Sequence, residues 1–492
     1  MVSLTPLDAS LTPVPAPASK RKRSFRVQRA LLVLLIVGTV ELLAWSIAVP
    51  ALQEPDEESH FSYVQVIAER GEIPWQRSGG SPGGPVSPEQ QVASVWAGLQ
   101  PLLANPAARP LWTEPDERAW RAQDAALGRD ARSSIEPSSA FQNPPAAYVY
   151  DAAVYVAVGG SFFDRLFALR WANLPLLLVM LAATWVLARD LFGDRQGAVV
   201  LATAVVALQP LLTSIAGGVT PDLLLCALFA VGLALSVRIV CRGPTTGRLV
   251  ALAFVSLLAP LTHGRGLALL VPAGLAVLLS WPPVRRIPRP ALAAGVGLAA
   301  LIVAVLVLRY AERGGPTLSD TRAFSSYLWQ FYLPGLPWMN PPPFEGWTIR
   351  DVYIDRLYGT FGQLEIMVPG WVTNVLAGAG LVLAVGVLAA AIARRDALRR
   401  MWAPVAVLVA AAVGAILLLH LQAYRSLLVE PGDPVITGRY LLPLLPVLGV
   451  AVAASLQALP RRAFAVAGGG VLAAAVLLQF AALGAMITRF YA

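Results

Sequence analysis

Long apolar stretches separated by short polar segments are the dominant pattern along the chain. Stretches close to the length of a membrane-crossing helix recur at residues 30–49, 166–187, 197–216, 223–240, 249–261, 266–281, 291–308, 371–393, 403–419, 440–459 and 463–487. A helix needs about 20 apolar residues to cross a bilayer, and inside lipid its backbone has to satisfy its own polar groups. We therefore predict an all-α fold, a polytopic transmembrane helical bundle of about 11 spans, with about 10 to 13 possible.

Positively charged segments between these stretches predict how the helices are oriented. Such segments precede residue 30 and recur at 189–195, 238–248, 285–289, 394–400 and 461–462. Cytoplasmic loops carry an excess of Lys and Arg, and all these segments fall on one side if the apolar piece 145–158 lies in the outer interface rather than crossing. The pattern predicts a multi-pass plasma-membrane protein with a cytoplasmic N-terminus. Two large loops, 52–165 and 309–370, then face outward.

Composition supports this picture and excludes some functions. The 492 residues are 57% hydrophobic, with a net charge of +9. Membrane topology accounts for the basic balance, so no nucleic-acid partner is expected. No phosphate-cradling GxxxxGK[ST] motif is present, so no nucleotide cofactor is expected. Residues 1–28 are predicted to be a disordered basic cytoplasmic tail, and residues 29–487 to form the transmembrane domain, with juxtamembrane helices in the first outer loop.

The stretch "EPDEESHF", residues 54–61, follows the first span directly. One interpretation is a helix start with Asp56 as its N-cap and acids in the first turn. His60 lies four residues after Asp56, so both side chains can share one helical face. Such a face at the bilayer surface can supply a general base, for which we select Asp56. It also suits a divalent cation, Mg²⁺ or Mn²⁺, held by Asp56, Glu57, His60 and Asp222.

The same four letters, "EPDE", recur at residues 114–117 without a following histidine. A helix with mixed charges follows them. We interpret this second copy as a solvated helix start that takes no part in chemistry.

Further polar residues are predicted to lie on the outer side. Asp222 opens a span, where it either caps a helix or serves a site. His263 and Arg265 lie in the turn "LTHGRGL", and Arg439 and Tyr440 lie in "GRYLLPLLP". An arginine can hold a phosphate by paired hydrogen bonds. The alternatives are a tight hairpin with a snorkelling arginine for the first turn and an interfacial anchor for the second.

The order of these motifs resembles the polytopic lipid-linked-sugar glycosyltransferases of the GT-C superfamily. The resemblance rests on Asp56-Glu57, the Pro-Pro start of the interfacial helix, "FALR" ending at Arg170, "RDLFG", Asp222, "LTHGRGL" and "GRYLLPLLP". The chain more closely resembles a bacterial family of predicted membrane proteins of unassigned function with P-D-E-x-x-H and G-R-Y-x-x-P motifs. In "YGTFGQLEIMVPGWV", residues 358–372, Gln363-Leu364-Glu365 replaces the usual Trp-Leu-Asp.

The resemblance implies a GT-C-like glycosyltransferase that moves a sugar from a polyprenyl-phosphate donor to an extracytoplasmic glycan or lipid acceptor in cell-envelope assembly. Asp56, with Glu57, would be catalytic. Arg265, Arg439 and His263 would bind the donor phosphate, with His263 standing where the family usually has lysine. His60, Asp222 and Tyr440 would support the site, which would face outside, among membrane lipids. Two alternatives are a transporter or flippase of a lipid-linked glycan and a non-catalytic membrane scaffold.

Overall fold

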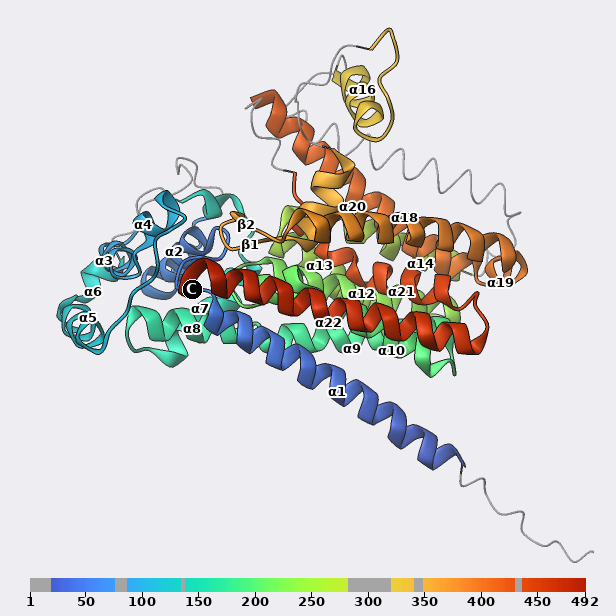
Figure 1. Cartoon of the computed structure of the whole chain (residues 1–492), viewed down its shortest axis with the longest axis horizontal. Helices are drawn as coiled ribbons and strands as arrows, with labels where there is room; N and C mark the ends of the chain where they lie inside the picture. Colours follow the sequence, from blue (N-terminus) through green and yellow to red (C-terminus); the bar gives the residue numbers. More distant parts are fainter. Residues whose placement is uncertain (1–18, 76–85, 134–137, 282–319, 340–347, 430–435) are drawn as a thin grey trace, which may run out of the picture.

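The structure, a computed structural model, describes residues 19–75, 86–133, 138–281, 320–339, 348–429 and 436–492. In these residues all regular secondary structure is helical, apart from one short hairpin (Figure 1). Its strands β1 (Thr360–Phe361) and β2 (Ile366–Met367) are antiparallel. The predicted all-α polytopic helical fold is confirmed.

Among the described residues, seven helical segments are long and apolar enough to cross a membrane. They are Arg29–Ala48 of α1 (Ser19–Ala48), α8 (Phe162–Ala172) with α9 (Leu174–Phe192), α12 (Asp222–Arg242), α18 (Gly370–Ala393), Trp402–Leu428 of α20 (Trp402–Val429), η5 (Gly438–Leu444) with α21 (Leu445–Leu456), and α22 (Arg461–Tyr491). An eighth consists of α10 (Gln196–Ala207) and α11 (Pro210–Ala216), bent by 54°. The bend falls at Pro210, which lacks the backbone N–H needed to continue the helix.

The other predicted spans differ in length or position. The predicted spans 249–261 and 266–281 correspond to shorter apolar helices, α13 (Thr246–Thr262) and η2 (Gly264–Leu269) with α14 (Leu270–Ser280). The predicted span 291–308 lies outside the described residues. Helix α1 begins at Ser19, so the expected tail to residue 28 is corrected for residues 19–28. Lys and Arg are good helix formers, which allows the span to extend through its basic flank.

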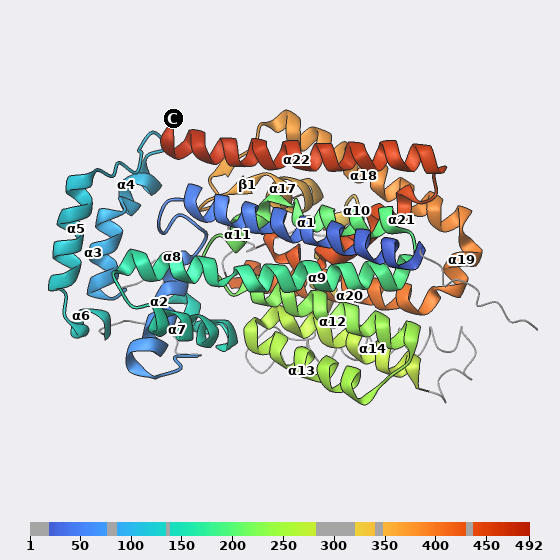
Figure 2. The same cartoon turned by 90° about the horizontal axis from the view of Figure 1, so that it is seen from below.

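The first of the two predicted outer loops folds into short helices that gather at one end of the bundle (Figure 2). They are α2 (Glu57–Arg70), α3 (Pro88–Trp96), α4 (Leu99–Ala104), α5 (Glu114–Ala126), α6 (Arg129–Ser133), η1 (Ser139–Gln142) and α7 (Ala146–Val158). They enclose a core of their own, centred on Phe61, Tyr148 and Phe162. Helix α7 is a shorter apolar helix, as expected for the piece 145–158.

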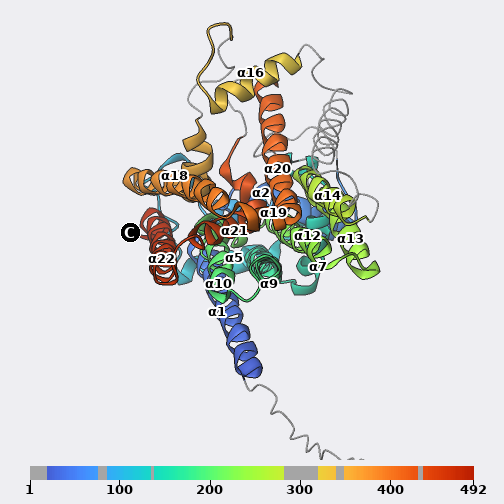
Figure 3. The same cartoon turned by 90° about the vertical axis from the view of Figure 1, so that its right-hand side faces the viewer.

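The described residues of the second predicted outer loop contain three short elements besides the hairpin. They are α16 (Asp320–Tyr332), η4 (Asp351–Asp355) and α17 (Arg356–Tyr358). An end-on view shows α16 beyond α20 on one side of the bundle and α1 on the opposite side (Figure 3). The hairpin reaches the end of α1, where Phe361 packs on Trp45 with ring centroids 5.1 Å apart.

Helix α12 is the centre of the bundle. It contacts α9, α13, α14, α20 and η5, and most of its side chains are buried. Its N-terminal end lies beside the start of α2, because the backbone N–H of Val219, three residues before α12, donates to Glu57. The basic helix α19 (Arg395–Arg400) lies at the opposite end (Figure 1). The fold thus separates the arginine-rich segment from the predicted site residues along the long axis.

Candidate functional site

The chain turns sharply between α1 and α2 and presents Asp56 at the turn. Leu52 and Asp56 both adopt left-handed backbone conformations, with φ of 63° and 61°. The Asp56 side chain does not cap α2, so the expected N-cap role is wrong. An N-cap residue needs an extended backbone to aim its oxygen at the helix, which the left-handed conformation prevents. The carboxylate instead lies 3.1 Å from Nη2 of Arg439, with its side chain 60% exposed.

A buried ion pair holds this turn in place. Arg170, at the end of α8, donates to both carboxylate oxygens of Glu57 at 2.8 and 2.6 Å. Its remaining N–H groups donate to backbone carbonyls at the end of α1, of Ser46, Val49 and Pro50. All five guanidinium hydrogens therefore have acceptors. The predicted catalytic residue Glu57 is fully buried in this pair, so its carboxylate fixes the turn and does not reach the surface beside Asp56.

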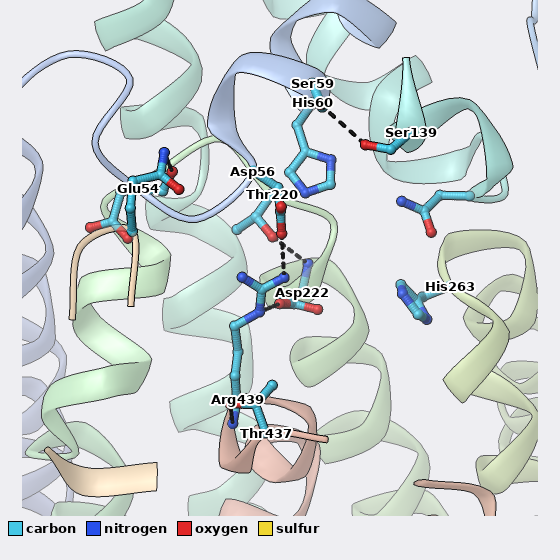
Figure 4. A network of polar contacts seen from close by, with 12 residues as sticks. Glu54, Asp56, Ser59, His60, Ser139, Thr220, Asp222, His263, Thr437 and Arg439 are labelled. Atoms are coloured by element: carbon cyan, nitrogen blue, oxygen red, sulfur yellow. Dashed lines mark hydrogen bonds and ion pairs between the residues drawn. The ribbon is translucent and has the colours of Figure 1, made fainter. Parts of the chain in front are cut away.

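Arg439 and Arg265 share the carboxylate of Asp222 below Asp56. Nη2 of Arg265 donates to Oδ1 of Asp222 at 2.5 Å. Nε of Arg439 lies 3.0 Å from Oδ2 of Asp222, although these two atoms are not aligned as a hydrogen bond. Figure 4 shows Asp56, Asp222 and Arg439 converging from three different elements. The structure thus brings together four predicted site residues, Asp56, Asp222, Arg265 and Arg439, which we call the charge cluster.

Exposure and free donors distinguish the members of the charge cluster. The side chains of Asp222, Arg265 and Arg439 are at most 8% exposed, in contrast to Asp56. Buried Nη1 of Arg265 has no hydrogen-bond partner among the described residues. The cluster carries two positive and two negative charges. It therefore combines an exposed carboxylate with buried guanidinium groups that retain unused donors.

The two arginines occupy turns of the same design. In the turn before Arg265, Nδ1 of His263 accepts the backbone N–H of Arg265 at 3.1 Å. In the turn before Arg439, the hydroxyl of Thr437 accepts the backbone N–H of Arg439 at 3.5 Å. Each turn then continues as a short 3₁₀ helix, η2 or η5. The side chain two residues before each arginine therefore closes the turn that aims the guanidinium.

A glycine packs each turn against a neighbouring backbone. A Cβ on Gly266 would lie 2.1 Å from the carbonyl oxygen of Ala259, and one on Gly438 would lie 2.5 Å from that of Val352. No side chain fits either position, because real Cβ contacts essentially never fall below 3.0 Å. The close approach at Gly266 seats η2 against α13.

His263 and Tyr440 both contact the guanidinium group of Arg265. Nδ1 of His263 also accepts Nε–H of Arg265 at 3.2 Å. Burial and the neighbouring Arg265 lower the pKa of His263 well below its usual value, which agrees with a neutral ring that accepts. The Arg265 guanidinium lies 4.2 Å from the centre of the Tyr440 ring, within cation–π range. Both residues therefore orient Arg265, which fits the predicted supporting role of Tyr440.

His60 lies beside Asp56, one turn into α2 (Figure 4). Its Nδ1 lies 2.9 Å from the hydroxyl of Tyr148, which also receives a hydrogen bond from Nδ2 of Asn143 at 3.0 Å. Tyr148 is 1% exposed, so its hydroxyl is buried inside the protein. The sequence pattern that indicates this burial is the helical spacing of Tyr148, Ala152 and Tyr155, which places them on one face of α7. All three residues are buried.

The predicted cation site does not form in this arrangement. Within the described ranges, no three His, Cys, Asp or Glu side chains are grouped as metal ligands. Glu57 uses both oxygens on Arg170, and Asp222 faces two arginines. Positive charges already occupy the places that a cation would need.

Burial and neighbouring charges shift the pKa values of the acids on either side of the turn in opposite directions. Partial burial raises the pKa of Asp56, but the positive charge of Arg439 outweighs it and holds this pKa below its usual value. Burial, and then the neighbouring Glu57, raise the pKa of Glu54 to about 8. Glu54 is therefore neutral at neutral pH, with one oxygen accepting from the hydroxyl of Ser214 at 3.0 Å.

The hairpin residue that departs from the family pattern also contacts the turn. Nε2 of Gln363 donates to the carbonyls of Leu52 and Glu54 at 3.0 and 3.1 Å. In the sequence, Gln363 stands out only as a departure from the family pattern. Leu52 and Glu54 lie 311 and 309 positions earlier in the chain, so no local sequence pattern indicates this contact.

The second "EPDE" is a helix start, as predicted. Thr113 and Asp116 form a reciprocal capping box at the beginning of α5. Glu114 and Glu117 pair with Arg118 and Arg121 on the exposed surface.

Several solved structures resemble this fold, among them the two that follow. ArnT from Cupriavidus metallidurans bound to undecaprenyl phosphate matches with a TM-score of 0.40 and 17% identity, over 91% of this chain and 64% of that one. The oligosaccharyltransferase of Archaeoglobus fulgidus matches with a TM-score of 0.47 and 12% identity, over 93% of this chain and 56% of that one. The chain thus spans less than two thirds of the length of either protein. No curated protein matches it.

A family match covers the charge cluster as well as most of the chain. Residues 40–448 match the family described as "Predicted membrane protein (DUF2142)". This range begins inside α1 and ends in α21, so it includes the turn at Asp56 and both arginine turns. The predicted resemblance to a family of membrane proteins of unassigned function is confirmed. The chain belongs to the DUF2142 family of predicted membrane proteins.

Proposed function

We propose that the charge cluster is the active site of a membrane glycosyltransferase of the GT-C type. Its donor is a sugar linked to a polyprenyl phosphate, and its acceptor is a hydroxyl group of an envelope glycan or lipid outside the cytoplasm. The observation that carries the proposal is the exposed Asp56 carboxylate above two buried guanidinium groups, at the ends of apolar spans.

The ligand class follows from the chemistry of the cluster. Paired arginine N–H groups match the oxygens of a phosphate, and Arg265 retains an unused buried donor at Nη1. The ends of membrane spans suit a phosphate whose chain remains in lipid. A lipid-linked phosphate satisfies both conditions.

The reaction assigns each charged group one task. The acceptor oxygen attacks the anomeric carbon, and the bond from that carbon to the phosphate oxygen breaks. The acceptor proton passes to Asp56, which Arg439 keeps ionised and therefore able to accept it. The electron pair leaves with the polyprenyl phosphate, whose developing charge Arg265 and Arg439 stabilise. Asp222 holds the two guanidinium groups in place before the donor binds.

A strain that lacks the gene tests the proposal. Liquid chromatography with mass spectrometry of its lipids should show accumulation of a polyprenyl-phosphate-linked sugar, together with loss of an envelope glycan. Asp56→Asn should reduce transfer by about a hundredfold or more, because the base is lost. The matched control is Asp116→Asn in the second "EPDE", which should restore transfer. Full restoration by Asp56→Asn would remove the base assignment, and unchanged lipid-linked sugars would contradict sugar transfer.

A further inference from the structure

His60 is a buried histidine whose two ring nitrogens have different surroundings. Its side chain is 4% exposed. Nδ1 contacts the Tyr148 hydroxyl at 2.9 Å, whereas buried Nε2 has no hydrogen-bond partner among the described residues. Such an unmatched buried group is costly in a folded protein and calls for an explanation.

The neighbours of His60 determine which nitrogen carries the proton. The amide nitrogen of Asn143 can only donate, so the Tyr148 hydroxyl accepts that hydrogen bond. The hydroxyl hydrogen of Tyr148, which is 1% exposed, then needs an acceptor of its own. In the part of the chain that the structure describes, Nδ1 of His60 is the acceptor within reach. Nδ1 therefore presents a lone pair, and the single proton of a neutral imidazole lies on Nε2.

The ring is neutral at neutral pH. Burial lowers the pKa of His60, and Arg439 lowers it further, while Asp56 and Asp222 raise it less than burial lowers it. The buried Nε2–H is therefore a neutral donor that lies next to Asp56 and has no acceptor among the residues that the structure describes.

We propose that His60 donates its Nε2 hydrogen to a phosphate oxygen of the ligand bound at the charge cluster, with Tyr148 and Asn143 as positioning residues that select this tautomer. The inference rests on the proposed function, which supplies the phosphate. It assigns His60 the role of a binding residue in place of the metal ligand that the sequence suggested. A protonated Nε2 has no lone pair to offer a metal.

The tautomer can be measured directly, because the chain contains only 3 histidines. We expect long-range ¹H–¹⁵N correlation spectra of ¹⁵N-histidine-labelled protein in lipid nanodiscs to show His60 protonated at Nε2 at pH 7. Tyr148→Phe should mix the two tautomers. Tyr150→Phe on the same helix should not, because the Tyr150 hydroxyl donates elsewhere, to the carbonyl of Ala172. An Nδ1–H tautomer or an imidazolium in the wild type would overturn the inference.

Binding of undecaprenyl phosphate tests the donor role. Gln places its amide nitrogen near the position of Nε2, whereas Asn places its amide near Nδ1. His60→Gln should therefore bind within about threefold of the wild type, and His60→Asn about tenfold or more weakly. Equal affinities of the two variants would overturn the inference. A parallel titration with inorganic phosphate identifies the source of the phosphate, since binding of inorganic phosphate alone would indicate a free ion.

The two proposals fail in different ways. If the wild type binds undecaprenyl phosphate while the His60 resonances do not move, the inference about His60 fails and the proposed function stands. If the wild type does not bind undecaprenyl phosphate at all, the proposed function fails, and the role of His60 fails with it.

Discussion

Two copies of the same four residues, Glu-Pro-Asp-Glu, end in opposite environments. In the second copy, Asp116 caps its own helix and is exposed to solvent. In the first copy, Asp56 has a left-handed backbone conformation and its side chain makes no capping hydrogen bond to α2. Its carboxylate instead pairs with Arg439, 383 positions later in the chain. The local sequence favours the cap in both places. The two aspartates differ because of contacts with distant parts of the chain. Asp56 pairs with Arg439, and the ion pair of Arg170 with Glu57 fixes the turn that carries Asp56.

Glu54 provides a prediction about stability against pH. Its pKa rises from a usual 4.5 to about 8 in the folded protein. Between these values the folded chain keeps a proton that the unfolded chain has lost. The free energy of unfolding should therefore fall as pH rises, by roughly 1 kcal/mol per pH unit from this group. Chemical denaturation in detergent micelles at several pH values between about 5 and 8 measures this slope.

Glutamine at this position removes the titration with little change in shape. Glu54→Gln should lose that part of the slope. The matched control is Glu114→Gln, at the same position of the exposed second "EPDE", which should keep the slope unchanged. A wild-type slope in Glu54→Gln would show that the buried carboxyl does not titrate as described.

At the scale of the element, the glycines beside Arg265 differ sharply. A Cβ on Gly266 would lie 2.1 Å from backbone, whereas one on Gly264 would meet nothing within 4 Å. Gly266→Ala should force η2 away from α13, destabilise the protein by about 1–3 kcal/mol and displace Arg265. Thermal unfolding and undecaprenyl phosphate binding measure these effects.

Gly264→Ala is the control for this prediction, because it adds the same methyl group two residues earlier. It should leave both stability and binding close to wild type. Equal behaviour of the two variants would mean that the close approach of η2 to α13 does not position the guanidinium.

Local patterns predicted helices well and their interruptions less well. Apolar stretches located the spans because burial in lipid depends on length and hydrophobicity. The break at Pro210 was not predicted, although Gln209 stabilises it by accepting from Leu212 N–H and donating to the carbonyl of Leu357. The contact with Leu357 joins segments 148 positions apart, so no local window contains it.

At the scale of the whole molecule, the fold brings the head of the chain to its late turns. Asp56 follows the first span, Asp222 opens α12, and Arg439 precedes α21. The sequence placed all three on one predicted side of the membrane through its basic segments. It could not show that they touch, because the order in which spans pack depends on side-chain fit across the whole bundle. The same packing determined that Glu57 is buried away from Asp56.

The affinity of purified protein in lipid nanodiscs for undecaprenyl phosphate tests the central claim most directly. Arg265→Gln and Arg439→Gln should each weaken binding at least about tenfold, because charge-assisted bonds to phosphate are lost. Asp222→Asn keeps both arginines but loses the carboxylate charge that holds them in place, so it should weaken binding less than either arginine variant. The exposed control Arg118→Gln should change nothing. Wild-type affinity in both arginine variants, or loss of binding in Arg118→Gln as well, would contradict a phosphate site at the charge cluster.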